Sequence, residues 1–266
     1  SQSVLIAIAD NESAPTVTLA VSATSIAENA GSSLTLTATL SGATNADVTV
    51  ALSTSGTSTE GTDYTDGSGN IDDIVISAGS TTGTVSFTPS DDSVYEDDET
   101  ATIAISSVSG GSASESGSQS VTITITENES APTVTLAVSA TSIAENAGSS
   151  LTLTATLSGA TDSAITVALD TSGTATEGTD YTDGSGNIDD ITISAGSTTG
   201  TVNFPPTDDS VYDAASDETA TIAINGVSGK TGVAEHGTPQ TVTITITDNE
   251  SAPTVTLTTS ATSIAE

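Results

Sequence analysis

The sequence predicts an all-β protein made of tandem antiparallel β-sandwiches. Three observations lead to this prediction. Apolar residues alternate with threonine over short segments, which is the pattern of half-buried strands. Glycine, serine and aspartate separate these segments, and no segment shows the 3.6-residue period of an amphipathic helix. Long stretches of sequence also recur along the chain, so one folding unit is repeated.

Recurring segments define the repeat. Residues 13–44 and 130–161 are identical, and a third copy opens at Ser251. Residues 1–12 instead resemble 118–129, the end of a repeat. We therefore expect the chain to be a window on a longer tandem array. It divides into the last strand of a preceding repeat, two whole repeats and the first strand of a following repeat: residues 1–12, 13–129, 130–250 and 251–266.

The first three predicted strands of a repeat lie at 17–21, 34–40 and 48–52. In the segment 34–40, leucine and alanine alternate with threonine, so one face is apolar and the other carries hydroxyl groups. The other two alternate valine and leucine with threonine or alanine. Each of these segments is therefore expected to bury one face and to present the other to water.

Four further strands are predicted at 74–76, 85–87, 103–105 and 121–125, each with apolar residues two positions apart. The resulting seven strands per repeat, separated by turn residues, match an immunoglobulin-like antiparallel β-sandwich in size and strand number. The chain has 2 Phe, 4 Tyr, no Trp and no Cys. The core is thus built from small side chains, without a disulfide to reinforce it.

The charge of the chain restricts its partners. It carries 35 acidic residues against a single Lys, for a formal net charge of −34. Such a surface repels nucleic acid and anionic lipid and favours divalent cations. No apolar stretch approaches the length of a membrane-spanning helix, so no membrane insertion of this segment is expected.

The acidic residues collect in four connections between the predicted strands. Glu28 lies between the first and second strands, and Asp63 between the third and fourth. The run 91–99 lies between the fifth and sixth, and 127–129 follows the last. Since antiparallel strands reverse direction at every turn, these connections can meet at one pole of a sandwich. Bare anions would repel one another there, whereas bridging cations would turn the same oxygens into a coordination site.

Four motifs carry a resemblance to a known family. In order, they read SIAEN, EGTDYT, DDSVYEDDET and VTITITENE. This order and spacing resemble the Calx-β domain, the calcium-binding sandwich of sodium–calcium exchangers, integrin-type matrix proteins and large bacterial surface adhesins. The resemblance covers residues 13–129 and 130–250. It implies Ca²⁺ as the cofactor, with a Kd of roughly 10⁻⁴–10⁻³ M, as in extracellular calcium modules.

The resemblance also implies the ligands, all of them carboxylates. In the first repeat they are Glu28, Asp63, Asp91, Asp92, Glu96, Glu99, Glu127 and Glu129. In the second repeat they are Glu145, Asp180, Asp208, Asp209, Asp213, Glu218, Asp248 and Glu250. Asp213 replaces a longer Glu, and two extra residues separate it from Glu218, so weaker binding of a second ion is expected there. Each exit segment also has Asn between its two acids, where other family members carry a third acid.

The function that these features indicate is structural. We expect calcium-rigidified spacer repeats of a long extracellular fibre or adhesin, on the cell surface or secreted. Its partners would be calcium ions, neighbouring repeats of the same chain and other copies of the fibre. No catalytic set or phosphate-binding loop is recognisable, so an enzyme is not expected. Two alternatives stay open: a binding module for a carbohydrate or a partner protein, and a subunit that self-assembles laterally into a filament or sheath.

Several residues have simpler interpretations. Asp72, Asp73, Asp97 and Glu115 are expected to be ordinary surface acids. Lys230 and His236 are expected to be loop residues. The NES sequence occurs at the end of each repeat and forms an N-glycosylation sequon, but its place in the exit segment favours a role in the linker.

Overall fold

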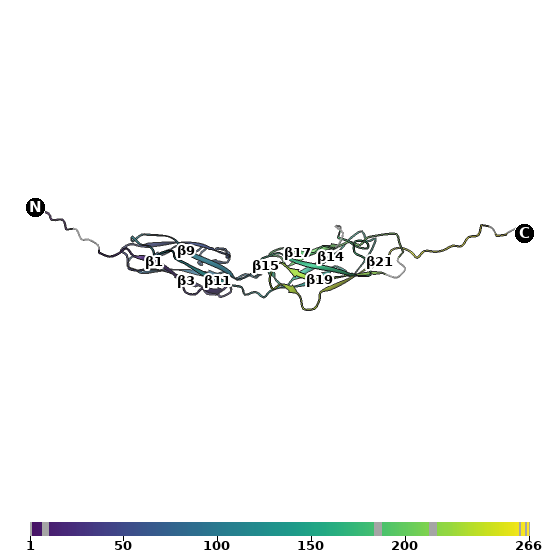
Figure 1. Cartoon of the computed structure of the whole chain (residues 1–266), viewed down its shortest axis with the longest axis horizontal. Helices are drawn as coiled ribbons and strands as arrows, with labels where there is room; N and C mark the ends of the chain where they lie inside the picture. The colour runs from purple at the N-terminus through teal and green to yellow at the C-terminus, as the bar shows by residue number, and fades with distance from the viewer. Residues whose placement is uncertain are drawn as a thin grey trace. The chain divides into compact units, whose positions relative to one another are not determined.

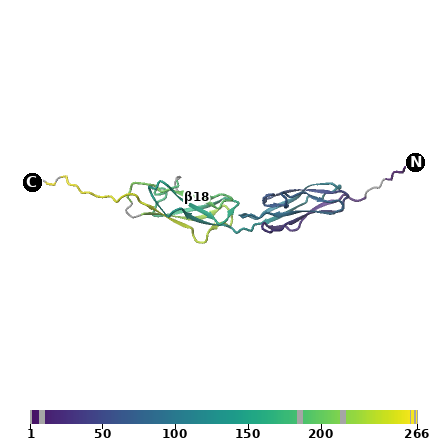
Figure 2. The ribbon, with the colours of Figure 1, turned by 180° about the vertical axis from the view of Figure 1, so that it is seen from behind.

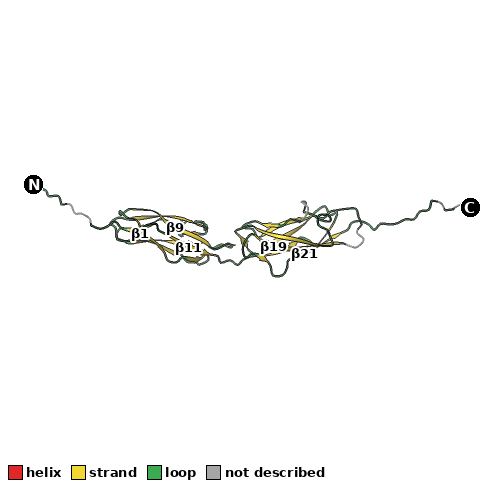
Figure 3. Cartoon of the chain, in the orientation of Figure 1, coloured by secondary structure: helices red, strands yellow, loops and turns green. Residues whose placement is uncertain are grey.

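The computed structural model describes residues 2–6, 11–183, 188–212, 217–260, 262–263 and 265. The chain divides into two compact units, Ser1–Glu129 and Ser130–Glu266 (Figure 1). Within the described ranges all regular structure is β-strand, joined by loops and turns (Figure 3). None of those residues forms a helix long and apolar enough to cross a membrane.

The first unit contains two five-stranded sheets among its described residues. In the first sheet β1 pairs antiparallel with β3 and β3 antiparallel with β7, while β10 joins β1 in parallel. In spatial order this sheet consists of β10 (Ser114–Glu115), β1 (Thr16–Val21), β3 (Leu34–Leu40), β7 (Thr82–Pro89) and β5 (Tyr64–Thr65). The second sheet consists of β2 (Ser25–Ala27), β11 (Ser120–Thr126), β9 (Glu99–Ser109), β4 (Val48–Gly56) and β6 (Ile74–Ile76).

The core of the first unit lies between these two sheets. Val17, Leu36 and Phe87 come from the first sheet, and Ile103 and Ile123 from the second; all five are fully buried. These positions are the apolar members of the alternating segments, so the period of two places one face of every strand in the core. The two sheets therefore form the predicted β-sandwich.

A pair of stacked aromatic rings lies in this core. Tyr64 on β5 stacks on Phe87 on β7, with ring centroids 4.6 Å apart and an interplanar angle of 21°. In the second unit Tyr181 and Phe204 stack at the same centroid distance. Since Tyr64 follows Asp63 directly in the sequence, the buried ring also anchors an acidic residue of the pole.

The second unit repeats this architecture. Figure 2 shows it from behind, with β18 labelled. Its described residues form a four-stranded and a five-stranded sheet. The first consists of β18 (Thr199–Phe204), β14 (Leu151–Leu157), β12 (Thr133–Val138) and β20 (Ala234–Glu235). The second consists of β13 (Ser142–Ala144), β21 (Thr241–Thr247), β19 (Glu218–Ser228), β16 (Ile165–Gly173) and β17 (Ile191–Ile193).

The seven predicted strands of the first repeat correspond to β1, β3, β4, β6, β7, β9 and β11. The fold class is thus confirmed, but the prediction of seven strands omitted the shorter ones. Within the described residues the first unit also contains β2, β5, β10 and β8 (Val94–Tyr95), and the second contains β15 (Ala160–Thr161). These strands have only two or three residues, too few to show an alternating pattern.

Lys230 is a loop residue, as predicted. It lies in the turn between β19 and β20, but its side chain is only 4% exposed. Its Nζ donates to Oδ2 of Asp162 at 3.0 Å, which compensates the cost of burying the charge. His236, just past β20, contacts Oγ1 of Thr133 through Nδ1 at 3.1 Å.

Candidate metal centre

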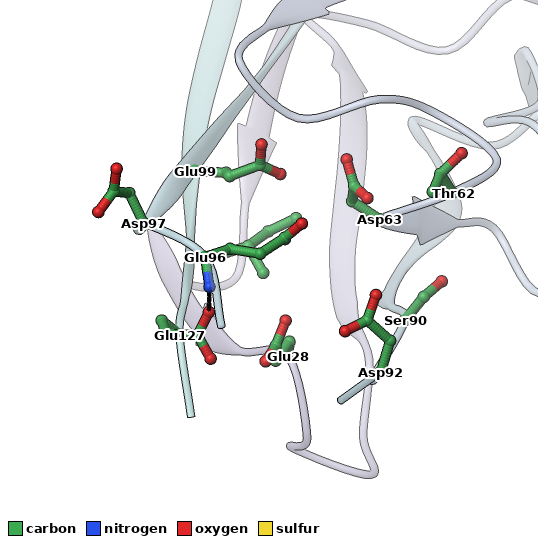
Figure 4. Close-up of a pocket in the computed structure, with 10 residues that line it drawn as sticks. Glu28, Thr62, Asp63, Ser90, Asp92, Glu96, Asp97, Glu99 and Glu127 are labelled. Carbon is green, nitrogen blue, oxygen red and sulfur yellow. Dashed lines mark hydrogen bonds between the residues drawn. The ribbon is translucent and has the colours of Figure 1, made fainter. Parts of the chain in front are cut away.

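Carboxylates from four connections meet at one pole of the first unit (Figure 4). Glu28 follows β2, and Asp63 directly precedes β5. Asp92 and Glu96 lie on either side of β8, and Glu127 follows β11. Segments far apart in the sequence thus place their acids around one cavity, as the order of the strands predicted.

The lining of this cavity is dominated by oxygen-bearing side chains. It consists of Glu28, Thr62, Asp63, Ser90, Asp92, Glu96, Asp97, Glu99 and Glu127, with the apolar side chain of Ile125. Thr62 and Ser90 were missed in the sequence because an isolated hydroxyl residue carries no pattern. Asp97 borders the cavity and is exposed, as expected of a surface acid.

Two groups of three carboxylates can be distinguished at this pole. Oxygen atoms of Glu28, Asp91 and Glu129 lie within 4.8 Å of one another. Oxygen atoms of Asp63, Glu96 and Glu99 form a second group by the same measure. Together with Asp92 and Glu127 in the cavity lining, these groups contain all eight acids expected in the first repeat. Their role as ligands stays a prediction.

Backbone hydrogen bonds hold the acidic connections in place. Oδ2 of Asp63 accepts from the backbone N of Thr59 at 2.5 Å, and Oδ1 of Asp92 accepts from the backbone N of Val94 at 2.7 Å. The backbone N of Glu96 donates to Oε2 of Glu127, which ties the connection after β7 to the segment after β11. The loops therefore hold these carboxylates in place.

A glycine brings two strands together beside this pole. Gly56, the last residue of β4, has a φ of +131°. A Cβ at this position would lie 2.0 Å from the carbonyl oxygen of Thr100. Only glycine permits this approach, which packs the end of β4 against the start of β9, next to Glu99.

Glu28 is the most informative residue of the cluster, because it is a buried acid with an uncompensated oxygen. Its exposed fraction is 8%, and its Oε1 has no hydrogen-bond partner. Oδ1 of Asn128 and Oε2 of Glu129 are also buried without a partner. Buried oxygen atoms normally have a hydrogen-bond or ion partner, so three of them in one place are consistent with the predicted cation site.

Burial and neighbouring acids change the proton affinity of this cluster. Burial, the contact with the Glu129 carboxyl and the negative charge of Glu127 raise the pKa of Glu28 to about 8. The pKa of Glu129 is lowered, chiefly by hydrogen bonding to the carboxyl of Glu28. One proton therefore stays on Glu28 near neutral pH when no cation compensates the cluster.

The stability of the calcium-stripped protein should consequently depend on pH. Between 4.5, the ordinary pKa of Glu, and about 8, the folded protein keeps a proton on Glu28 that the unfolded chain has released. This stabilisation is complete below pH 4.5 and is lost as the pH rises through about 8. We expect Glu28→Gln, which is neutral at every pH, to melt at a temperature that depends less on pH over this range. Calorimetry after removal of calcium by dialysis measures the melting temperatures. If the melting temperature depended equally on pH in both proteins, the raised pKa of Glu28 would not be the cause.

The second unit has a corresponding cluster. Oxygen atoms of Glu145, Asp208 and Glu250 lie within 4.8 Å of one another. A hydrogen bond with the carboxyl group of Glu145, together with burial, raises the pKa of Glu250 to about 7. The cavity beside them is lined by further acids of the predicted set: Asp180, Asp209, Glu218 and Asp248. Asp213 lies outside the described residues.

Other acids have structural roles that the sequence did not indicate. Oδ1 of Asp73 accepts from the backbone N of Leu52 at 3.1 Å, and Oε1 of Glu115 accepts from the backbone N of Gln119. Asp73 is exposed, as expected of a surface acid, whereas Glu115 is partly buried. Glu60 accepts from Oγ1 of Thr54 at 2.8 Å and fastens the loop before β5 to β4.

The donor set fits calcium rather than a softer metal. All the side chains in the two groups offer carboxylate oxygens, and the cavity adds hydroxyl oxygens. Hard oxygen donors in irregular loops suit Ca²⁺, which accepts six to eight ligands in flexible geometry. A bound Ca²⁺ would supply positive charge that compensates these oxygens, including the unpartnered Oε1 of Glu28.

The fold and the acidic pole define a protein of tandem β-sandwich domains, each with a cluster of hard oxygen donors at one end. The chain belongs to the Calx-beta domain family, whose family model matches residues 10–129 and again residues 127–250. The resemblance inferred from the four motifs is thereby confirmed for both repeats. No match was found among curated proteins.

Solved structures with similar folds include tandem domains and adhesins. CBD12 from CALX1.2 is 18% identical, with a TM-score of 0.37, and the match covers 86% of this chain and 99% of that one. Invasin, a bacterial integrin-binding protein, is 18% identical, with a TM-score of 0.43; the match covers 88% of this chain and 40% of invasin. The Yersinia pseudotuberculosis adhesin InvE is 15% identical, with a TM-score of 0.35, and the match covers 86% and 58%.

Proposed function

We propose that this chain is a calcium-stabilised structural spacer of a long extracellular surface fibre or adhesin. The observation that carries the proposal is the position of the carboxylate groups. Glu129 belongs to a three-carboxylate group of the first unit and is also its last residue, directly before Ser130. Glu250 has the corresponding position in the second repeat. In each unit, one of the carboxylate groups thus includes the segment through which the chain leaves the repeat.

The segment between this site and the next sandwich is short. Pro132 restricts the backbone just before β12 begins at Thr133. Calcium bound to the exit acids would therefore restrict the chain close to where the following repeat starts. The strong negative charge supports the same function, because it keeps the arrays soluble and gives divalent cations a large effect on their stability.

Small-angle scattering of the whole chain tests this function. We expect the maximum dimension to be larger and more narrowly distributed in calcium than in chelator, since ligation would stiffen the connection between repeats. Magnesium at the same concentration is the control, because it requires a more rigid octahedral site. If the scattering and the melting temperature were both unchanged by chelation, the spacer mechanism would be wrong.

A further inference from the structure

An amide side chain lies among the three carboxylates of the second unit. Nδ2 of Asn249 is 2.8 Å from Oε1 of Glu145 and 3.1 Å from Oδ1 of Asp208. It is also 3.1 Å from both carboxylate oxygens of Glu250. The donor of one neutral side chain is therefore shared by the same three acids that form the candidate ion site.

Further contacts fix the orientation of this amide. Oδ1 of Asn249 accepts a hydrogen bond from Nδ2 of Asn146, so the carbonyl end is occupied outside the carboxylate group. The backbone N of Asn249 donates to Oε1 of Glu145 at 2.9 Å. The side chain consequently directs its donor, and not its acceptor, toward the acids.

The first unit has the same residue types but a different arrangement. Oδ1 of Asn128, the counterpart of Asn249, is buried without a hydrogen-bond partner. Oε1 of Glu28 and Oε2 of Glu129 are likewise buried and unpartnered, whereas no buried oxygen of the second cluster is left without a partner among the described residues. Asn128 hydrogen-bonds to Glu28 through its backbone and to Glu129 through its side chain. Three buried oxygens of the first cluster stay without a partner, whereas in the second unit one amide bridges three acids.

We propose that Asn249 is an internal competitor of calcium, whose amide nitrogen occupies the carboxylate oxygens that a cation would need. This inference rests on the proposed function, because it assumes that the cluster binds calcium. An ion entering the second site has to displace hydrogen bonds to charged acceptors, which weakens its apparent affinity by about tenfold. The first repeat, which has no such amide bridge, then fills at lower calcium concentration than the second.

The substitution Asn249→Ala separates competition from ligation. If the amide competes, removing it strengthens calcium binding by the second unit about tenfold, although it weakens that unit in chelator. If Asn249 instead served calcium as an oxygen ligand, the same substitution would weaken binding. Asn128→Ala is the matched control: its side chain hydrogen-bonds to Glu129 and does not bridge three acids, so a smaller gain in affinity is expected in the first unit.

Hydrogen exchange of the intact 266-residue chain during calcium titration reads both units at once. Peptides covering 85–95 and 202–212 differ in sequence and report on the two acidic connections separately. If Asn249→Ala leaves the calcium concentration at half-maximal protection of the second unit unchanged, or raises it, the competition is wrong. A complete lack of calcium-dependent protection in both units of the unmutated chain would overturn the proposed function, and the competition with it.

Discussion

Calcium at about 10 mM is expected to raise the melting temperature of the chain by about 10 °C relative to chelator. With a Kd of roughly 10⁻⁴ M, this concentration is about 100 times Kd, and each bound ion adds about 2.7 kcal/mol to the free energy of unfolding. Calcium would stabilise the folded state because only the folded chain holds the carboxylate oxygens of the cluster together. Oε1 of Glu28, which is buried without a partner, is one of these oxygens. Differential scanning calorimetry measures the shift.

Two comparisons make this result specific. Magnesium at the same concentration is expected to stabilise much less, because it does not readily give up its waters. Asp63→Asn removes one charge from the group that Asp63 forms with Glu96 and Glu99. We expect calcium to raise the melting temperature of this variant by less than that of the unmutated chain. Equal stabilisation by both ions would show a general screening of the net charge instead of a calcium site.

Phe87→Ala is expected to destabilise the first unit by about 3–5 kcal/mol. Phe87 is fully buried and stacks on Tyr64, so its removal leaves a cavity in a core that has few large side chains. The loss lowers the melting temperature of the first unit by more than about 10 °C. Calorimetry should resolve this early transition, and hydrogen exchange of residues 82–90 should identify it with β7.

The second unit provides the control for this variant. Residues 199–207, which include Phe204, should keep their protection in Phe87→Ala if the two compact units unfold independently. Val75→Ala, at a β6 residue that is 53% exposed, should change the stability by less than about 0.5 kcal/mol. Loss of protection in both units of Phe87→Ala would show that they unfold as one.

Most of the fold could be predicted because the longer strands alternate so regularly. In β3, for example, Leu36 and Ala38 are buried while Thr35 and Thr39 are exposed, as the period of two requires. The short strands could not be found in this way. β2 and β10 are held by parallel pairing to the distant strands β11 and β1, and such long-range pairing leaves no local pattern in the sequence.

The candidate site was predictable to the level of which connections meet, but not to the level of individual contacts. Glu28 and Asp63 could be assigned to one pole from the reversal of strand direction. Whether a given oxygen is compensated depends on side-chain orientation, as the difference between Asn128 and Asn249 shows. Both lie in an acid–Asn–Glu segment, so the sequence alone gives them the same role.

The identity of residues 13–44 and 130–161 has a consequence for the folding of the two repeats. Val17 opposes Leu40 across β1 and β3, and Val134 opposes Leu157 in the second unit, so either first strand fits either partner. In a fully denatured molecule, each first strand therefore has two equivalent partner strands. Refolding at high protein concentration then favours exchange of strands between molecules. Vectorial synthesis removes this ambiguity, because each repeat can close on itself before its duplicate leaves the ribosome.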